Sequence, residues 1–273
     1  MIKLNNKSFL IIGAGNMGFS FIHSLVNHKF SYKNIIVLEK KPSKKILELK
    51  KKKKITLIKN DDELVYKFKP DLVLIAVKPN DLETIFSNRL TSLIKNSVIL
   101  SIVAGKKTSV LRKLSKQKSN VVRAMTNTPV SVGMGSSIIF LDNKVGLKAK
   151  YLSRQFLELV GQVIETTKES QIDTFTAIFG SGPAYIYYFI ETLSKIAMKN
   201  GFKKSDQMVI HLFLGSILLM INNEEHPTTL REKVTSKGGT TDSAIKSLMK
   251  SNNFYNILEK AIIRAKKRSK ELN

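Results

Sequence analysis

The stretch Phe9–Gly18, FLIIGAGNMG, constrains the fold of this chain more than any other feature. Its first four residues, Phe9–Ile12, form an apolar run that is typical of a strand buried on both faces. The glycines that follow have G-x-G-x-x-G spacing, and the next residues, FSFIHSLV, are apolar at near-helical intervals. A strand, a glycine turn and a helix in this order predict a dinucleotide-binding unit.

Each glycine of this turn has its own physical role. Gly13 permits the tight turn, Gly15 lets the backbone approach a pyrophosphate, and Gly18 lets the helix pack closely on the strand. The N-terminus of the helix offers unpaired N–H groups and a positive dipole end to the phosphates. The alternative is a tight turn that binds nothing, but the flanking strand and helix favour a cofactor.

Strand-like and helix-like segments alternate from this unit to about residue 165. The strand-like segments are Asn34–Glu39, Ile55–Ile58, Asp71–Val77, Ser97–Val103, Val121–Met125 and Ser136–Leu141, followed by a short extended segment, Gln162–Glu165. The helix-like segments are Ser43–Lys54, Asp62–Phe68, Leu82–Ile94, Thr108–Leu114 and Lys144–Val160. This alternation predicts an α/β fold with a doubly wound parallel sheet of Rossmann type, whose ligands bind at the carboxyl edge of the strands.

The pattern becomes entirely helical beyond about Glu165. The expected helices are Gln171–Ile178, Ala184–Asn200, Ser205–Asn222, Pro227–Lys233, Thr240–Lys250 and Asn253–Leu272. We therefore expect a dinucleotide-binding domain over residues 1–165 and an all-helical domain over residues 166–273.

The end of the second strand bears on the choice of cofactor. Glu39 lies 21 residues beyond Gly18, where an acidic side chain meets the ribose hydroxyls of a bound cofactor. Lys40 and Lys41 follow at once, and either could instead hold the 2′-phosphate of NADPH. The alternative for Glu39 is a solvated carboxylate at a strand end. The choice between NADH and NADPH stays open.

The formal net charge of +25 over 273 residues raises the question of a nucleic-acid partner. Only seven of the 46 basic residues are arginine, the residue that reads bases and phosphates bidentately. The densest lysine run, Lys50–Lys54, has no interleaved aromatic residues for base stacking. We expect a solvated lysine-rich surface that attracts anionic cofactors and substrates, and no nucleic-acid partner.

Composition excludes several other kinds of site. Without cysteine, the chain has no disulfide, thiolate zinc site or cysteine nucleophile, and its four histidines share no metal-ligand spacing. The first residues lack the apolar core of a signal peptide. The apolar stretches Phe175–Ile190 and Met208–Ile221 fall short of the roughly 20 residues of a membrane span. We expect a cytoplasmic protein with no membrane and no metal, in which both stretches are core or subunit-interface helices.

A second glycine-containing loop, VTSKGGTT, occupies Val234–Thr241. Its small residues precede a helix and expose successive N–H groups, which makes the loop suitable for a carboxylate. The alternative is a helix N-cap with a flexible glycine entry. No nucleophile–base pair is evident, as suits an enzyme whose cofactor carries the difficult chemistry.

Five motifs occur in one order along almost the whole chain: GAGNMG, AVKP at Ala76–Pro79, RAMTNTP at Arg123–Pro129, GSGPAY at Gly180–Tyr185, and HP…VTSKGGTT at His226–Thr241. Together they resemble pyrroline-5-carboxylate reductase, the last enzyme of proline synthesis. The resemblance implies reduction of the ring imine of 1-pyrroline-5-carboxylate to L-proline with NADPH or NADH. It also implies a helical C-terminal domain that builds an interlocked homodimer, and dimers that often assemble further into rings.

The resemblance implies roles for individual residues. Those that match cofactor-binding positions are Gly13, Gly15, Asn16, Met17 and Gly18 at the pyrophosphate, Ala76, Val77, Lys78 and Pro79 beside the ribose and nicotinamide, and Ala104, Met125, Asn127 and Thr128 near the nicotinamide. Those that match substrate positions are Ser236, Gly239 and Thr240 at the carboxylate, within the loop that also contains Gly238, and Glu224 near the substrate. Thr241 matches the hydroxyl that faces the ring nitrogen, and we expect it to be the catalytic residue.

Two departures from the family pattern stand beside these sites. Thr126 and Lys237 occupy positions where the family usually has proline, and each frees a φ angle and adds a donor. Lys237 also adds a cation near the expected carboxylate site, although we expect it to face solvent. The alternatives to this function are a related imine or β-hydroxyacid reductase for another small carboxylate, and a non-catalytic NAD(P)-binding regulatory protein.

Overall fold

The computed structural model describes residues 4–64, 68–117 and 120–271. The chain forms two compact units. The first unit comprises Met1–Ser181 and Ala265–Asn273, and the second comprises Gly182–Arg264. The division between residues 165 and 166, expected from the change of sequence pattern, stays a prediction.

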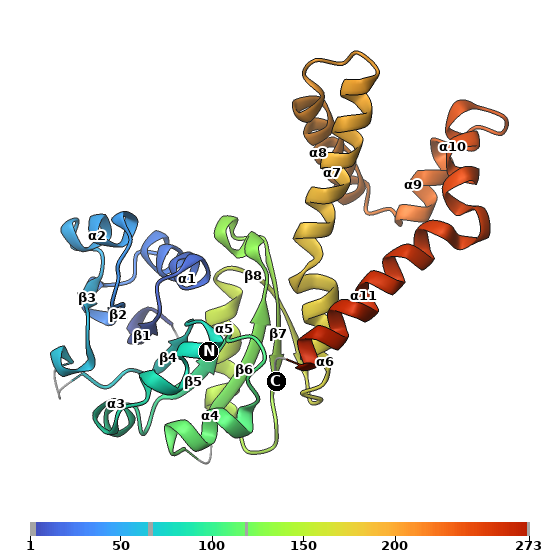
Figure 1. Ribbon diagram of the computed structural model, residues 1–273. Helices are drawn as coiled ribbons and strands as arrows, with labels where there is room; N and C mark the ends of the chain where they lie inside the picture. Colours follow the sequence, from blue (N-terminus) through green and yellow to red (C-terminus); the bar gives the residue numbers. More distant parts are fainter. Residues whose placement is uncertain (1–3, 65–67, 118–119, 272–273) are drawn as a thin grey trace. The chain divides into compact units, whose positions relative to one another are not determined.

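The first unit is built on an eight-stranded sheet in the described part of the chain. Its strands are β1 (Phe9–Ile12), β2 (Ile35–Leu38), β3 (Thr56–Ile58), β4 (Leu72–Ile75), β5 (Val98–Ser101), β6 (Val121–Thr126), β7 (Gly135–Phe140) and β8 (Gly161–Thr166). Their spatial order is β3-β2-β1-β4-β5-β6-β7-β8, and every pairing from β3 to β6 is parallel (Figure 1). This order confirms the α/β fold of Rossmann type, with its switch point between β1 and β4.

Alternating side chains of the strands build one apolar core on each face of the sheet. Phe9 and its alternate neighbours pack with α1 (Asn16–Asn27), α2 (Lys44–Lys51) and α5 (Leu147–Glu158). Leu10 and its counterparts pack with α3 (Asn88–Leu93) and α4 (Thr108–Ser115) on the other face.

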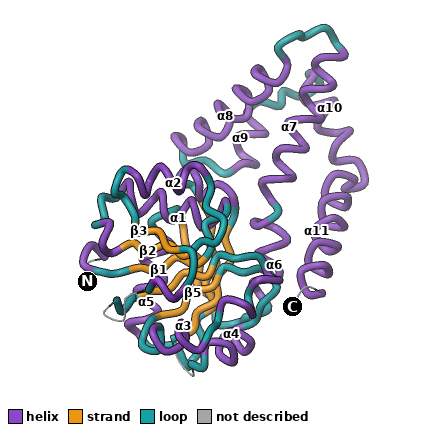
Figure 2. Tube along the Cα trace, turned by 60° about the vertical axis from the view of Figure 1, so that its left-hand side comes forward, coloured by secondary structure: helices purple, strands orange, loops and turns teal. Residues whose placement is uncertain are grey.

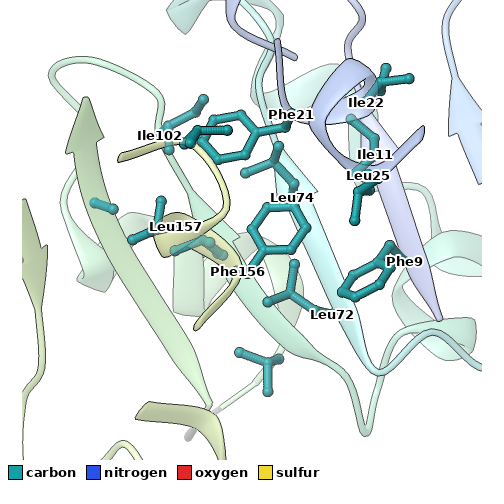
Figure 3. Packing of buried hydrophobic residues seen from close by; sticks show 14 of the residues in the cluster. Phe9, Ile11, Phe21, Ile22, Leu25, Leu72, Leu74, Ile102, Phe156 and Leu157 are labelled. Carbon is teal, nitrogen blue, oxygen red and sulfur yellow. The ribbon is translucent and has the colours of Figure 1, made fainter. Parts of the chain in front are cut away.

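Aromatic stacking joins two of the helices across the first of these cores. The rings of Phe21 and Phe156 stack with centroids 5.3 Å apart, and Phe9 lies 5.2 Å from Phe156 (Figure 3). All three side chains are fully buried. Such burial contributes roughly 1.5–3 kcal/mol per large apolar side chain, so this core holds β1, α1 and α5 together.

The far edge of the sheet differs from the expected all-parallel arrangement. β7 runs antiparallel to β6, and the segment expected to be merely extended is a full strand, β8, parallel to β7. Gly135 and Gly161 begin these two strands, and a methyl carbon at Gly161 would overlap the carbonyl oxygen of Gly135. The close approach of two backbones therefore aligns β8 along β7.

Two segments expected as single helices are broken. Leu82–Ile94 contains a 3-10 turn, Glu83–Ile85, before α3, which begins where the Ser87 hydroxyl accepts the Leu90 N–H at 2.9 Å. Over the expected helix Asp62–Phe68 the structure has a 3-10 turn, Asp61–Glu63, while residues 65–67 lie outside the described residues. Side-chain caps fix where each helical piece begins: Ser87 caps the start of α3, and Asn60 caps the start of the 3-10 turn.

The C-terminal region is helical, as expected (Figure 2). The first unit includes α6 (Gln171–Phe175) and a π-helical turn, Thr176–Gly180. The second unit contains α7 (Gly182–Lys199), α8 (Ser205–Asn223), α9 (Pro227–Lys233) and α10 (Thr240–Met249), of which α7 and α8 pack against each other. The last helix, α11 (Asn253–Glu271), runs from the second unit into the first, and the expected end at Leu272 lies outside the described residues.

Helix α8 is longer than the apolar stretch that the sequence singled out. An 18-residue window of this 19-residue helix has a mean hydropathy of 1.3, so by length and composition it is able to cross a membrane. Only 11% of it is buried within the chain. This helix therefore exposes an apolar surface that needs a partner.

Candidate functional site

The glycine turn lies at the switch point of the sheet, between the ends of β1 and β4. Gly13 has a φ of +92°, and a methyl carbon there would lie 2.8 Å from the carbonyl oxygen of Ala76. A methyl carbon at Gly18 would overlap the carbonyl oxygen of Gly13, whereas no atom lies within 4 Å of such a carbon at Gly15. Packing therefore requires glycine at Gly13 and Gly18, and Gly15 leaves open space beside the turn.

Helix α1 begins at this open space. Gly15 is its N-cap and has no side chain to satisfy the first N–H groups, which belong to Asn16, Met17 and the residues that follow. An anion placed here meets unpaired donors and the positive end of a 12-residue helix. The geometry of the turn fits a phosphate group.

The second expected cofactor segment begins where β4 ends. The Ala76 N–H donates to the carbonyl oxygen of Ile12 at 2.9 Å, which ties this segment to β1. Val77 follows, Lys78 is exposed, and Pro79 starts a 3-10 turn, Pro79–Asp81. The structure thus brings the glycine turn and the AVKP segment together at one edge of the sheet.

Glu39 binds the glycine turn to the end of β2. Its Oε2 accepts the Ala14 N–H at 2.8 Å, and its Oε1 accepts the Lys41 N–H at 2.9 Å. The Gly13 N–H also donates to Leu38 O at 3.0 Å. The carboxylate is half-buried, while Lys40 and Lys41 are exposed. Glu39 therefore has a fixed orientation beside the turn.

The end of β6 is joined to the π-helical turn through Asn127. The Asn127 Nδ2 donates to Phe179 O at 3.1 Å, and its Oδ1 accepts the Ser136 N–H at 2.9 Å. A methyl carbon at Gly180 would lie 3.7 Å from Cε of Met125. The RAMTNTP and GSGPAY motifs are therefore in contact within the first unit.

Two further residues expected near the nicotinamide follow strand ends. Thr128 is exposed and begins a 3-10 turn, Thr128–Val132. Ala104 is half-buried and follows β5. Both lie in loops after the carboxyl ends of neighbouring strands, β6 and β5.

Thr126 uses the hydroxyl that a proline would lack. Its Oγ1 accepts the Ser137 hydroxyl at 2.9 Å and donates to Ser136 O at 3.3 Å. Both Thr126 and Ser137 are buried. The departure from the family pattern at residue 126 is therefore accommodated by bonds between β6 and β7.

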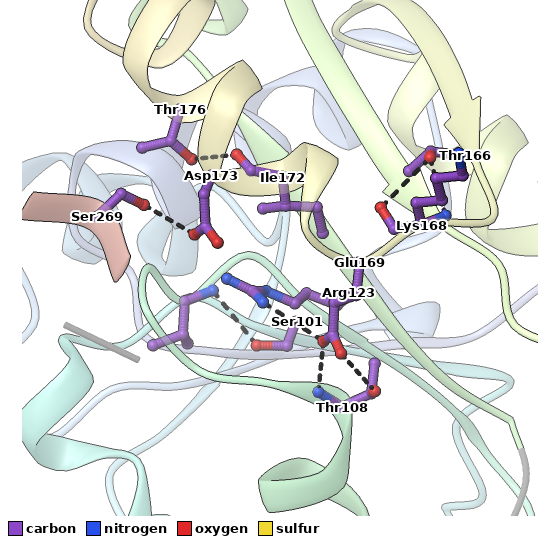
Figure 4. Close-up of polar contacts among 11 residues, drawn as sticks. Ser101, Thr108, Arg123, Thr166, Lys168, Glu169, Ile172, Asp173, Thr176 and Ser269 are labelled. Atoms are coloured by element: carbon purple, nitrogen blue, oxygen red, sulfur yellow. Dashed lines mark hydrogen bonds and ion pairs between the residues drawn. The ribbon is translucent and has the colours of Figure 1, made fainter. Parts of the chain in front are cut away.

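A buried polar network, which sequence reasoning missed, lies beside these loops (Figure 4). The guanidinium of Arg123 lies 3.3 Å from Oε1 of Glu169, and the same oxygen accepts the Thr108 N–H at 2.8 Å. The Ser269 hydroxyl donates to Oδ1 of Asp173 at 2.9 Å. These contacts join β6, α4, α6 and the end of α11 in the first unit. Of these residues, Arg123 alone lies in a motif that the sequence analysis singled out, RAMTNTP.

The VTSKGGTT loop in the second unit is shaped by its own backbone and by one carboxylate. The Gly239 N–H donates to Ser236 O at 2.9 Å, and Gly238 has a φ of +76°. The Gly238 N–H donates to Oδ2 of Asp242 at 2.9 Å. Gly239 is the N-cap of α10, so Thr240 and Thr241 begin the helix, and both are exposed.

Asp242 is a residue of this loop that sequence reasoning missed. Lys246 lies 2.7 Å from its Oδ2, and hydrogen bonds from Lys246 and then from the Gly238 N–H hold the pKa of Asp242 below its usual range. Lys237 is exposed. An acidic residue at the third helical position is the sequence signal that could have indicated this cap.

Glu224 ends α8 in the left-handed conformation, with a φ of +53°, and its side chain is exposed. The next residue, Glu225, is instead paired with Lys233 at 2.6 Å. His226 caps α9 by accepting the Thr228 N–H at 3.3 Å. Sequence reasoning named the first of these two glutamates and missed the pairing of the second.

Metal ligands do not gather in the part of the chain that the structure describes. No group of three or more histidine, aspartate or glutamate side chains there has a geometry that could hold an ion. The described residues offer backbone donors, hydroxyls and carboxylates held by hydrogen bonds, which suit a nucleotide and a small anionic substrate.

Comparison with known proteins gives matches over nearly the whole chain. Residues 169–272 match a family model described as pyrroline-5-carboxylate reductase dimerisation, and residues 8–105 match one described as NADP oxidoreductase, coenzyme F420-dependent. Pyrroline-5-carboxylate reductase 1 of Bacillus subtilis is 32% identical over 98% of this chain and 90% of its own length. The Vibrio alginolyticus pyrroline-5-carboxylate reductase is 30% identical over 98% of each chain.

Solved structures agree with these sequence relatives. A pyrroline-5-carboxylate reductase from Coxiella burnetii has a TM-score of 0.86 and 30% identity over 98% of both chains. The pyrroline carboxylate reductase of Plasmodium falciparum, solved with NADP bound, has a TM-score of 0.83 and 26% identity over 99% of both. The motifs, the fold and these relatives together lead to one conclusion: the chain belongs to the pyrroline-5-carboxylate reductase family.

Proposed function

We propose that this chain reduces 1-pyrroline-5-carboxylate to L-proline with NAD(P)H, the final step of proline biosynthesis. The observation that carries the proposal is a likeness that spans 98% of the chain and includes relatives named for this reaction. The reaction adds a hydride to the imine carbon and a proton to the ring nitrogen, so the C=N bond becomes a C–N single bond.

Residues of the first unit bind and orient the cofactor in this proposal. Open space at Gly15, the uncapped start of α1 and the adjacent AVKP segment support it. The assigned residues are Gly13, Gly15, Asn16, Met17, Gly18, Glu39, Lys40, Ala76, Val77, Lys78, Pro79, Ala104, Met125, Asn127 and Thr128. The bound nicotinamide supplies the hydride.

Residues of the second unit bind the substrate. Ser236, Gly238, Gly239 and Thr240 hold its carboxylate, for which the first N–H groups of α10 are suitable donors. Glu224 lies near the substrate, and the hydroxyl of Thr241 hydrogen-bonds the ring nitrogen. Positioning contributes most of the rate enhancement, since well-oriented reactants gain up to about 7–11 kcal/mol. Protonation makes the imine the better electrophile, and this proposal takes the proton from solvent, since the sequence shows no strong general acid among the assigned residues.

Oxidation of NADH and NADPH with pyrroline-5-carboxylate tests this function directly. Thr241→Ala is expected to lower kcat/KM by roughly 10- to 100-fold, because it removes a hydrogen bond to the reacting group. Its affinity for the cofactor should stay unchanged. The matched control is Thr228→Ala, since Thr228 is likewise exposed at the second position of a helix in the same unit.

Two results would contradict these assignments. A chain that binds either cofactor but oxidises neither with this substrate is a regulatory protein, and the proposed reaction fails. A Thr241→Ala variant with the wild-type rate leaves the reaction in place but removes Thr241 from its mechanism.

We extend the proposal to a homodimer formed through the second unit. Two apolar grooves support this: one of about 520 Å³ between α7 and α8, and one of about 730 Å³ between α7 and α11. The dimerisation model covers these helices. Rings built from such dimers, a cytoplasmic location and the absence of membrane and nucleic-acid partners belong to the same proposal. Mass measurement, cell fractionation and salt-dependent DNA retention test them.

A further inference from the structure

The carboxylate of Glu39 is fixed before any ligand arrives. Its two oxygens each accept one backbone N–H, from Ala14 at 2.8 Å and from Lys41 at 2.9 Å. One of these donors belongs to the glycine turn and the other to the loop after β2. Because each carboxylate oxygen accepts more than one hydrogen bond, both keep capacity for a further donor.

A carboxylate in this position distinguishes the two nicotinamide cofactors. The adenosine ribose of NADH offers vicinal hydroxyls, which donate to carboxylate oxygens. NADPH replaces the 2′-hydroxyl by a phosphate, which brings about two negative charges and only acceptor oxygens at neutral pH. Glu39 cannot turn away without losing its bonds to the Ala14 and Lys41 N–H groups. Its carboxylate therefore repels the 2′-phosphate electrostatically and receives no hydrogen bond from it.

The neighbouring lysines act in the opposite direction but less selectively. Lys40, Lys41 and Lys44 follow within five residues, and all three side chains are exposed. Attraction from exposed, flexible ammonium groups is screened over about 8 Å at physiological salt. The same groups also attract the pyrophosphate that both cofactors share, so they raise both affinities.

We propose that Glu39 is a specificity-determining residue that makes this chain select NADH over NADPH. The inference rests on the proposed function, which assigns a nicotinamide cofactor to the glycine turn. It differs from what the names of the relatives suggest, since one structural relative holds NADP and one family model is described as NADP oxidoreductase.

Calorimetric titration of the full-length protein with NADH and NADPH, without substrate, measures the preference. At about 0.15 M salt, NADH is expected to bind at least about tenfold more tightly than NADPH. Glu39→Gln keeps an acceptor for the Ala14 N–H but removes the charge, and should shift the ratio by about tenfold or more towards NADPH.

Glu63→Gln is the matched control. Glu63 also follows a strand of the same sheet, and its Oε1 accepts the N–H groups of Lys59 at 2.9 Å and Asn60 at 3.4 Å. It therefore performs the same backbone-capping chemistry at the end of β3, on residues outside the glycine turn. Its removal should leave the ratio of the two affinities unchanged.

A second measurement needs no variant. ADP-ribose and 2′-phospho-ADP-ribose compete with NADH for the wild-type protein, and the unphosphorylated competitor is expected to be at least about tenfold stronger. Tighter binding of NADPH at about 0.15 M salt, or an unchanged ratio in folded Glu39→Gln, overturns the inference. Loss of the proposed reaction is a separate result, because these titrations contain no imine.

Discussion

Asn127 and Thr126 form hydrogen bonds within the protein itself. Asn127 joins Ser136 to Phe179, and Thr126 joins β6 to the first residues of β7. Met125, on β6, has its side chain next to Gly180. At the scale of single residues, hydrogen bonds from these two side chains hold the loop that is expected beside the nicotinamide. We propose that both side chains act on the bound cofactor by fixing the position of the backbone.

Replacing Thr126 by valine tests this role. The change keeps the shape of the side chain but leaves the buried Ser137 hydroxyl without its acceptor, which costs about 1–3 kcal/mol. We expect Tm to fall by roughly 2–8 °C and KM for the cofactor to rise. Thr126→Ser, which keeps the hydroxyl, is the control. Equal thermal unfolding curves for Thr126→Val and the wild type would contradict this role.

Asp242 provides a pH-dependent prediction for the substrate loop. Hydrogen bonds from Lys246 and the Gly238 N–H lower the pKa of Asp242 in the folded chain. Because the pKa of Asp242 is lower in the folded chain, the contact stabilises the loop at pH values above the ordinary carboxyl pKa of about 4. This stabilisation is lost as the pH falls through the pKa of Asp242 in the folded chain. KM should therefore show no change from this group between neutrality and about pH 5.

The variant Asp242→Ala should raise KM for the substrate several-fold at neutral pH, because the Gly238 N–H loses its acceptor. The cofactor affinity should not change. Asp206→Ala is the control, since Asp206 also lies in the first turn of a helix of the second unit. An unchanged KM in Asp242→Ala would show that the loop keeps its shape without this contact.

At the scale of elements, the sequence predicts best what depends on local pattern. Strands β1, β2, β4 and β5 are buried on both faces, so each is a continuous apolar run. The antiparallel pairing of β7 with β6 follows no local pattern, and the pairing of β8 with β7 includes a close contact between Gly135 and Gly161, which lie far apart in sequence. The π-helical turn after α6 likewise has the same apolar pattern as an ordinary helix.

The candidate site divides along the same line. The glycines and the AVKP segment were predictable from sequence, because their roles follow from short contiguous motifs and from the strand, turn and helix around them. Two contacts of the buried polar network join residues that are far apart in sequence: Glu169 and Thr108 are 61 residues apart, and Asp173 and Ser269 are 96 residues apart. No sequence motif predicts either contact. Asp242 is local, but its bond to the Gly238 N–H depends on the left-handed conformation of a glycine.

At the scale of the whole molecule, the apolar surface of the second unit requires an explanation. Helix α8 is apolar on all sides, and residues such as Leu212, Ile217 and Leu218 are about half exposed in the single chain. A helix of this kind is buried in a protein interior, in an interface or in a membrane. Two apolar grooves beside α7 and the dimerisation model that covers this region favour a second copy of the chain.

Ile217→Glu tests this assignment in the groove between α7 and α8, where Ile217 is 44% exposed. A charge buried at a subunit interface without a partner is strongly unfavourable, so we expect the dimer dissociation constant to rise at least about 100-fold. Light scattering across a dilution series measures it. Ile164→Glu is the control, because Ile164 on β8 is 48% exposed in the first unit. A wild-type chain that is monomeric, or that partitions into detergent micelles through α8, would contradict the dimer. A wild-type mass above that of two chains, which falls to the mass of one chain only in Ile217→Glu, would support the dimer. It would also show that the larger assembly depends on the same interface.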